Sequence, residues 1–271
     1  MKPFTVGVCQ MDSKDNKEKN VERALELIDE AAEAGADLVS LPEVFTCIGP
    51  RETMREHAEP IPGPTTEKLA ARAKEHGIHV HGGSFFEVAE TDGKVHNTSV
   101  LIDDSGTILD SYRKLHLFDV EIDDEVENRE SELVEAGDEI VTVETDLATM
   151  GLSVCYDLRF PELFAALSNA GAEVIFVPAA FTLHTGKDHW EPLLRARAIE
   201  NQAYVVAAGQ IGPKPDSPTT YGKSLVADPW GNVVARASDR EGVFTADLDP
   251  ELVETIRWEL PSLEHKRHDV Y

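Results

Sequence analysis

The stretch Thr149–Leu163, with the sequence TMGLSVCYDLRFPEL, is the part of the chain from which the rest can be interpreted. Leu152 and Val154 alternate with small residues, which is the period-two pattern of a short strand. Pro161 suits the first turn of a helix. The pattern therefore predicts a strand-to-helix corner with Cys155 at the end of the strand.

This corner allows two interpretations of the Cys155 thiol. A nucleophile at such a corner is exposed and lies close to backbone N–H groups that can stabilise an oxyanion. A lone cysteine is, however, more commonly a buried structural residue. Position alone does not decide between a catalytic and a structural thiol, so the choice depends on which other side chains reach Cys155.

The composition predicts one α/β domain over residues 1–271. With 41% hydrophobic residues, the chain can bury a substantial core, and no internal break argues for two domains. We find no apolar run of about 18 residues that could span a membrane, and Met1–Phe4 leads directly into a strand, without room for a signal peptide. Cys9, Cys47 and Cys155 are too widely separated for a disulfide framework or a metal cluster, which favours a cytoplasmic protein.

The formal net charge of −26, from 51 acidic and 25 basic residues, is extreme. Such a surface repels nucleic acid and anionic membranes, so we expect neither as a partner. Concentrated salt screens the self-repulsion of an acidic surface, and acid excess of this size is typical of halophilic proteins. The alternative is an ordinary acidic cytoplasmic protein.

An acidic residue follows one of the first predicted strands. A strand over 4–10, a helix that ends near Ala34 and a strand over 37–42 form a strand–helix–strand unit, which predicts a parallel pair. Ligands bind at the carboxyl ends of such strands. Glu43 comes directly after the second strand, so we expect it on the same rim as Cys155. The alternative is a solvated loop acid.

The remaining predicted elements are strands at 79–85, 95–102, 107–115, 173–178, 204–210, 224–227, 233–237 and 243–247, and helices at 65–76, 188–201 and 251–259. His79 and His81 share one face of their strand. No further ligand lies at suitable spacing nearby, so packing or hydrogen bonding is favoured over metal binding.

Two adjacent cations, Arg113 and Lys114, end the strand at 107–115 in a chain that has few bases. A lysine here could hold a neighbouring thiol as a thiolate and stabilise the charge that develops on an attacked carbonyl. An ion pair with one of the many acids is the alternative. From 119 to 139 the chain is crowded with acids, which predicts a long, solvated loop over the site, and possible lid, rather than a metal cage.

Glu43, Lys114 and Cys155, in this order and each at a strand end, resemble the catalytic set of the nitrilase superfamily of carbon–nitrogen hydrolases. The resemblance extends from Phe4 to Tyr271. It depends on four motifs together: Leu41-Pro42-Glu43, Tyr112–His116, Gly151–Glu162 and Tyr221–Ser224.

The resemblance implies a four-layer αββα sandwich that forms a homodimer, or a higher homo-oligomer, by stacking its helices, with the tail 261–271 at a subunit interface. It also implies a second glutamate, Glu130, that orients Lys114 and the substrate. Glu43 would take the proton of the Cys155 thiol, and Lys114 and the backbone N–H of Tyr156 would stabilise the oxyanion. No metal or cofactor is implied.

The residues after the nucleophile are typical of the amidase branches. Nitrile-hydrolysing members place Trp-Glu where this chain has Tyr156-Asp157. The segments 185–191, 193–200 and 265–271 are similar to omega-amidases and deaminated-glutathione amidases, which hydrolyse the terminal amide of small 2-oxo acids. The resemblance therefore implies hydrolysis of linear amides of small carboxylic acids, with release of ammonia. We predict Arg195 and Phe181 as substrate contacts, although a structural role for Arg195 is the simpler interpretation.

Three alternatives stay open. The chain could be a nitrilase or an N-carbamoyl amidohydrolase of the same superfamily. It could be a Cys–His hydrolase in which His116, His184 or His189 is the base. Outside enzymes, it could be a catalytically silent acidic interaction protein with this fold.

Overall fold

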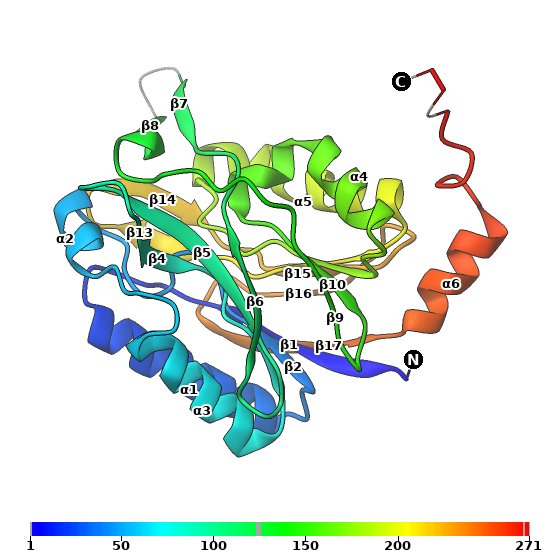
Figure 1. The fold of residues 1–271 in the computed structure, drawn as a ribbon, viewed down its shortest axis with the longest axis horizontal. Coiled ribbons are helices and arrows are strands. Elements are labelled where there is room, and N and C mark those ends of the chain that lie inside the picture. Colours follow the sequence, from blue (N-terminus) through cyan, green and yellow to red (C-terminus); the bar gives the residue numbers. More distant parts are fainter. Residues whose placement is uncertain (1, 123–125, 268, 271) are drawn as a thin grey trace.

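Two β-sheets packed face to face form the centre of the molecule, and helices cover both outer faces (Figure 1). The computed structural model describes residues 2–122, 126–267 and 269–270. Helices α1 (Lys17–Glu33) and α3 (Pro64–His76) lie on one side, and α4 (Pro161–Asn169) and α5 (Leu183–Asn201) on the other. This arrangement confirms the predicted αββα sandwich.

The first sheet has seven strands in the order β17 (Gly242–Leu248), β1 (Phe4–Gln10), β2 (Leu38–Ser40), β3 (His79–His81), β5 (Val95–Ile102) and β4 (Phe85–Val88), with β6 (Ile108–Arg113) paired to β5. The second has six, in the order β16 (Val233–Arg236), β15 (Leu225–Ala227), β12 (Tyr204–Ala207), β11 (Val174–Phe176), β10 (Thr149–Leu152) and β9 (Thr142–Glu144).

Each sheet contains a run of three parallel strands. In the first sheet β1, β2 and β3 are parallel, and in the second β10, β11 and β12 are parallel. Alternate side chains of β1 point to different layers: Val6 and Val8 pack in the core between the sheets, whereas Cys9 packs in the core beneath α1. Because these strands are parallel within each sheet, their carboxyl ends, and the residues that follow them, lie at one edge of that sheet.

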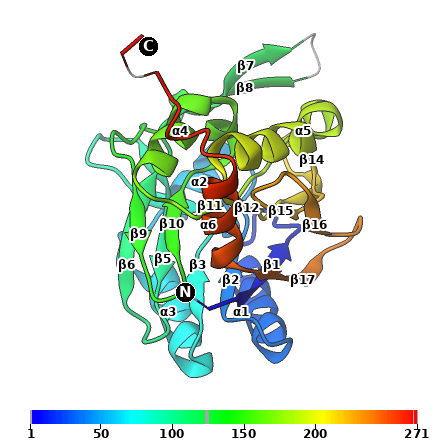
Figure 2. The ribbon, with the colours of Figure 1, turned by 90° about the vertical axis from the view of Figure 1, so that its right-hand side faces the viewer.

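Several segments differ from the sequence prediction, which contained neither β9 nor the short helix Arg51–Glu56. β4 was not predicted, and neither was the hairpin of β13 (Ile211–Lys214) and β14 (Ser217–Tyr221). Helix α5 begins at Leu183, not at Asp188, because the Thr182 side chain caps its N-terminus. The acidic segment is not one long loop: it contains the antiparallel strands β7 (Asp119–Ile122) and β8 (Val126–Arg129), which project from the sandwich (Figure 2). Residues 123–125 of that segment lie outside the described residues.

The remaining elements lie at the periphery. Short helix α2 (Arg51–Glu56) and the two 3₁₀ helices η1 (Glu130–Glu132) and η2 (Cys155–Arg159) border the strand ends, and α6 (Pro250–Glu259) projects from one end of the sandwich (Figures 1 and 2). None of the helices in the described part of the chain combines the length and hydrophobicity that a membrane crossing requires.

The two histidines of β3 make packing and hydrogen-bonding contacts, as predicted. His81 is buried between the hydroxyls of Ser40 (2.9 Å) and Ser99 (3.0 Å), and its ring stacks on Phe176 of the facing sheet at 4.3 Å. The neighbouring His79 lies 3.2 Å from Asp146. His81 thus joins the two sheets as a neutral ring.

We expect acid to destabilise the fold through His81. Burial lowers the pKa of His81 from 6.5 to about 3, so the unfolded chain binds this proton at a higher pH than the folded chain does. The contribution of His81 to stability is therefore complete above pH 6.5 and falls by about 1.4 kcal/mol per pH unit below it. Urea titrations of the wild type and His81→Gln between pH 7.5 and 4.5 measure this slope. Equal slopes for both proteins would contradict the assignment.

Candidate active site

Cys155 lies at a sharp corner between β10 and α4. Its φ angle of 48° is in the left-handed region, which non-glycine residues rarely adopt and which is enriched at functional sites. The backbone N–H of Cys155 donates to the Pro178 carbonyl at 2.9 Å, and the N–H of Val154 donates to the Asp157 carboxylate at 2.8 Å. The strained corner is therefore held by contacts on both sides of the thiol.

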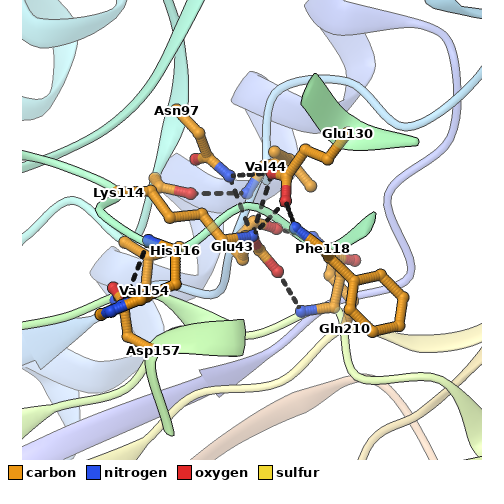
Figure 3. Close-up of polar contacts among 12 residues, drawn as sticks. Glu43, Val44, Asn97, Lys114, His116, Phe118, Glu130, Val154, Asp157 and Gln210 are labelled. Carbon is orange, nitrogen blue, oxygen red and sulfur yellow. Dashed lines mark hydrogen bonds and ion pairs between the residues drawn. The ribbon is translucent and has the colours of Figure 1, made fainter. Parts of the chain in front are cut away.

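Asp157 is the centre of a buried network beneath this corner (Figure 3). Its carboxylate accepts hydrogen bonds from the Tyr112 hydroxyl at 2.7 Å and from the backbone N–H of His116 at 3.1 Å, and lies 2.7 Å from Nδ1 of His116. Burial, followed by the charge of Asp157, raises the pKa of Tyr112 far above its usual value, so this phenol stays a donor. This network holds the backbone at Cys155 in place, and none of its own side chains is the nucleophile.

Lys114 lies just beyond β6 and joins two glutamates (Figure 3). Its Nζ is 3.0 Å from Oε1 of Glu43 and 2.9 Å from both carboxylate oxygens of Glu130. Lys114 and Glu43 are 2% and 4% exposed, so these charges interact out of bulk water. The structure thus brings Glu43, Lys114 and Glu130 into one cluster, although Glu130 comes from the acidic segment 119–139.

Further donors, which the sequence prediction missed, hold the two carboxylates. Nδ2 of Asn97 donates to Glu43 at 3.0 Å and to Glu130 at 3.4 Å. The backbone N–H groups of Ala180 and Phe118 donate to Glu43 and Glu130, each at 2.6 Å. Asn97 is a polar residue within a buried strand, VHNTSVLI, and that position was its only sequence signal.

The environment sets the protonation of the lysine and the thiol. Desolvation lowers the pKa of Lys114, but the charges of Glu130 and Glu43 outweigh it and raise the pKa well above its usual value. Burial raises the pKa of the Cys155 thiol well above its usual range, and the charge of Glu43 and a hydrogen bond with it raise it further, whereas Lys114 lowers it. The resting sulfur is therefore a thiol, and of the two interpretations of Lys114 the structure fits the ion pair with acids and not the stabilised thiolate.

A cavity of about 470 Å³ joins the thiol to the charged cluster. Its volume is in the range of small-molecule sites. It is lined by three groups of residues: the cluster itself with Cys155 and Asn97; an apolar wall that includes Val44, Ile48, Met54, Phe86, Leu133, Val134 and Ala180; and a polar part that includes Arg51, Asn128, Thr182, Asp216, Ser217 and Thr220. Cys155, Phe118, Ala180 and Thr182 also line a smaller recess, so the thiol lies where two compartments meet.

The smaller recess contains an arginine and aromatic rings. Phe181, predicted as a substrate contact, lines this recess together with Tyr156 and Arg159. The Arg159 guanidinium lies 5.9 Å from the centre of the Tyr156 ring and 5.2 Å from that of Phe181. It also lies 3.4 Å from Nδ1 of His189. The recess therefore places a positive charge beside the thiol.

Arg195, the other predicted substrate contact, does not reach either compartment. Its Nε donates to the Gly231 carbonyl at 2.7 Å, and its side chain is half-exposed on the outer side of α5. The prediction of Arg195 as a carboxylate ligand is wrong because this hydrogen bond holds the guanidinium against the turn between β15 and β16. The structural interpretation of Arg195 fits instead.

The histidine alternatives do not fit this geometry. His116 is bound to Asp157 and stacks on Phe160 at 3.6 Å, and His189 contacts Arg159. Over residues 2–122, 126–267 and 269–270, neither of them nor His184 lines a compartment that contains Cys155. Within the same residues, we find no group of three or more histidines, cysteines or acids that could hold a metal ion.

An αββα sandwich in which a buried thiol, an ammonium and two carboxylates surround one cavity has the architecture of a thiol-containing hydrolase. The chain belongs to the carbon-nitrogen hydrolase family, whose model matches residues 5–257. This result confirms the resemblance to the nitrilase superfamily and the assignment of the chain as an enzyme.

Relatives over the full length carry amidase names. The chain is 42% identical over 269 residues to the deaminated glutathione amidase of Synechocystis sp., covering 98% of this chain and 99% of that protein. It is 40% identical to the omega-amidase of Xenopus tropicalis, covering 100% of this chain and 98% of that protein. Among solved structures, the NitFhit protein of C. elegans matches with a TM-score of 0.94 and 41% identity, covering 100% of this chain and 66% of that longer chain.

Proposed function

We propose that this enzyme hydrolyses the C–N bond of linear amides of small carboxylic acids through a thioester on Cys155. The observation that carries the proposal is the buried thiol beside Glu43 and Lys114 at the junction of two compartments. In the first step, Glu43 takes the thiol proton as the sulfur attacks the amide carbonyl. The Lys114 ammonium and the Tyr156 N–H stabilise the oxyanion, and one such donor contributes about 10²–10³ in rate.

The same carboxyl group serves the later steps. Glu43, now protonated, gives its proton to the departing nitrogen, which leaves as ammonia or an amine, and the acyl group stays on sulfur. Glu43 then takes a proton from water, which attacks the thioester and releases the acid and the thiol. Glu130 and Asn97 hold Lys114 and Glu43 in place throughout. No step in this sequence uses a metal or an organic cofactor.

The two compartments indicate how a substrate would lie. Glu43, which protonates the leaving nitrogen, lines the larger cavity, so the amine side of the substrate belongs there. The acyl side then points toward Arg159, which borders the small recess beside the thiol, and a guanidinium there favours an acyl group that carries its own carboxylate. Relatives named for omega-amidase and deaminated glutathione amidase activity support this substrate class.

Replacement of Arg159 should change selectivity more than chemistry. Loss of one charged hydrogen bond costs about 1.5–3 kcal/mol, so we expect Arg159→Met to lower kcat/KM for amides with a distal carboxylate by roughly 10- to 100-fold. Neutral amides of the same length should change only a few-fold. Steady-state kinetics with matched acidic and neutral amides measure the ratio, and Arg195→Met is the control. An equal loss for both kinds of amide would contradict the assignment.

Release of ammonia or amine from a panel of small amides, measured in high salt, tests the proposed reaction. High salt is used because we propose, from the net charge of −26, that the protein is adapted to concentrated salt. Nitriles and N-carbamoyl amino acids in the same panel test the related activities, and no turnover of any member would favour a silent interaction protein.

We also propose a cytoplasmic homodimer or higher homo-oligomer built from one domain. Trp258 on α6 is 82% exposed and Leu260 is 51% exposed, and the tail 261–271 follows them directly. An apolar surface of this kind is typical of an interface between subunits. Sedimentation equilibrium tests the assembly, and a monomer at micromolar concentration would argue against it.

A further inference from the structure

The turn that carries Glu43 has a strained backbone. Val44 has a φ of 43°, and a β-branched residue in this region is a steric outlier that persists only when its surroundings impose it. On one side, Val44 N–H donates to the Ser84 hydroxyl at 3.0 Å and Phe45 N–H to the Ser84 carbonyl at 3.1 Å. Gly83 permits this approach, since a Cβ there would lie 2.1 Å from the Pro42 carbonyl oxygen.

Gln210 holds the other side of the same turn (Figure 3). Its Nε2 donates to the backbone carbonyl of Glu43 at 3.1 Å and to the Ser13 hydroxyl at 2.9 Å. The Ser13 hydroxyl in turn donates to the carbonyl of Phe45 at 2.8 Å. Gln210 and Ser13 therefore fix the carbonyl groups on both sides of Val44.

Lys214 and the backbone N–H of Ser13 together hold the oxygen of the Gln210 amide, and the Lys214 ammonium also donates to the Ser13 and Ile211 carbonyls at 3.2 and 2.9 Å. The Lys214 side chain is fully buried, and its Nζ lies 3.3 Å from Oε1 of Gln210 and 2.9 Å from Oδ1 of Asp12. The backbone N–H of Ser13 donates to the same Gln210 oxygen at 3.0 Å. With its oxygen held by two donors, the Gln210 amide can present only its NH₂ group to the Glu43 carbonyl.

We propose that Gln210 and Lys214 are positioning residues that hold the strained Glu43 turn, and thereby aim the Glu43 carboxylate at the Cys155 thiol. Within the described residues, neither side chain lines the cavity, so neither touches a bound substrate directly, although the part of the β13–β14 hairpin that follows Lys214 does line it at Asp216, Ser217 and Thr220. The proposal depends on the proposed role of Glu43 as the base.

The charge of Lys214 gives this positioning a pH dependence. Burial lowers the pKa of Lys214 to about 8, and the charge of Lys14 lowers it further. The hydrogen bond and charge of Asp12 and the charge of Glu241 act in the opposite direction and raise this pKa. When the ammonium loses its proton, its attraction for the Gln210 oxygen weakens. The pKa values of Cys155 and Lys114 are both raised, so neither group causes a loss of rate near this pH.

The test compares the wild type with Gln210→Met and Lys214→Met, and with Gln10→Met as a control. Gln10 is also buried, but its amide binds Ser238, Arg240 and Ser224, away from Glu43. Misplacement of a catalytic group by about 1 Å can cost 10²-fold, so we expect kcat to fall about 10- to 100-fold in both test variants, with KM changed only a few-fold. The control should keep its kcat. The wild-type kcat should fall as pH rises through about 8, and Lys214→Met should lack that fall.

Crystal structures of the wild type and Gln210→Met provide a readout that does not depend on turnover. We expect Val44 to leave the left-handed region and the Glu43 carboxylate to move away from Lys114 in the variant. A wild-type kcat in Gln210→Met, or a reduced kcat with Glu43 unmoved, overturns the proposal. If the wild type hydrolyses no amide, the proposed function fails, and the position of Glu43 in the two structures still decides the positioning role.

Discussion

Cys155→Ala should abolish amide hydrolysis while leaving the fold in place. Removal of the nucleophile from a catalytic set lowers kcat by roughly 10⁴-fold or more, because no other group can form the covalent intermediate. Alanine keeps the Cβ and the same backbone angles, so the corner held by Pro178 and Asp157 should persist. Steady-state ammonia release measures the loss, and mass spectrometry of the wild type during turnover should detect the acyl adduct on Cys155.

Cys9→Ala is the matched control for this experiment. Cys9 is also a buried free thiol, but it packs in the core beneath α1, away from the cavity. The control should hydrolyse amides at the wild-type rate. Hydrolysis by Cys155→Ala at a comparable rate would refute the nucleophile assignment, and an adduct on another cysteine would identify the correct one.

Lys114→Met should remove activity and also destabilise the protein. Methionine has a similar length but no charge, so Glu43 and Glu130 lose their shared cation in a buried site. Breaking a buried ion pair from one side costs about 3–5 kcal/mol, and loss of an oxyanion donor lowers kcat by about 10²–10³. The two carboxylates are then left close together without a cation between them, in a site shielded from water. Urea denaturation at pH 7.5 measures the loss of stability, and steady-state ammonia release measures the loss of kcat.

Two comparisons separate the electrostatic explanation from simple loss of packing. Lys114→Met/Glu130→Gln removes one of the unpaired charges, and it should recover stability at neutral pH without recovering activity. Lys17→Met breaks a part-buried ion pair with Glu59 outside the site, and it should lower stability but not the rate per folded molecule. If Lys114→Met is as stable as the wild type at pH 7.5, the ammonium does not hold the two carboxylates together.

The sequence predicted the central site because its three main residues each follow a strand. Strands with a clear hydrophobic pattern can be placed from local sequence, and parallel order aligns carboxyl ends within one sheet. These patterns predict, from the sequence alone, that Glu43 and Cys155 lie on one rim. Glu43 and Cys155 follow strands of different sheets, so their approach also depends on how the two sheets stack. Family resemblance was needed for Glu130, because nothing in the acidic composition of its segment distinguishes it from its neighbours.

The supporting residues could not be predicted because their partners are distant in the sequence. Asn97 and Gln210 bind Glu43 across 54 and 167 residues, respectively, and no local pattern encodes such contacts. Arg159 lies within the segment Gly151–Glu162, but its position beside Phe181, on which the role that we propose for it depends, cannot be predicted from that segment. Asp188 resembled a helix cap, and only the tertiary context shows that Thr182 performs this function.

The left-handed backbone at Val44 has a consequence for engineering. Such a conformation costs roughly 1–3 kcal/mol for a residue with a side chain, whereas glycine would adopt it without strain at an entropic cost of about 0.5–1 kcal/mol. Val44 is, however, also buried in a hydrophobic cluster with Ile48 and Phe86, and loss of a buried valine side chain costs about 1.5–3 kcal/mol. Glycine would therefore relieve the backbone without a net gain in stability, and the loosened Glu43 turn would slow catalysis. A library screened for thermal tolerance should thus keep an apolar side chain at this strained position.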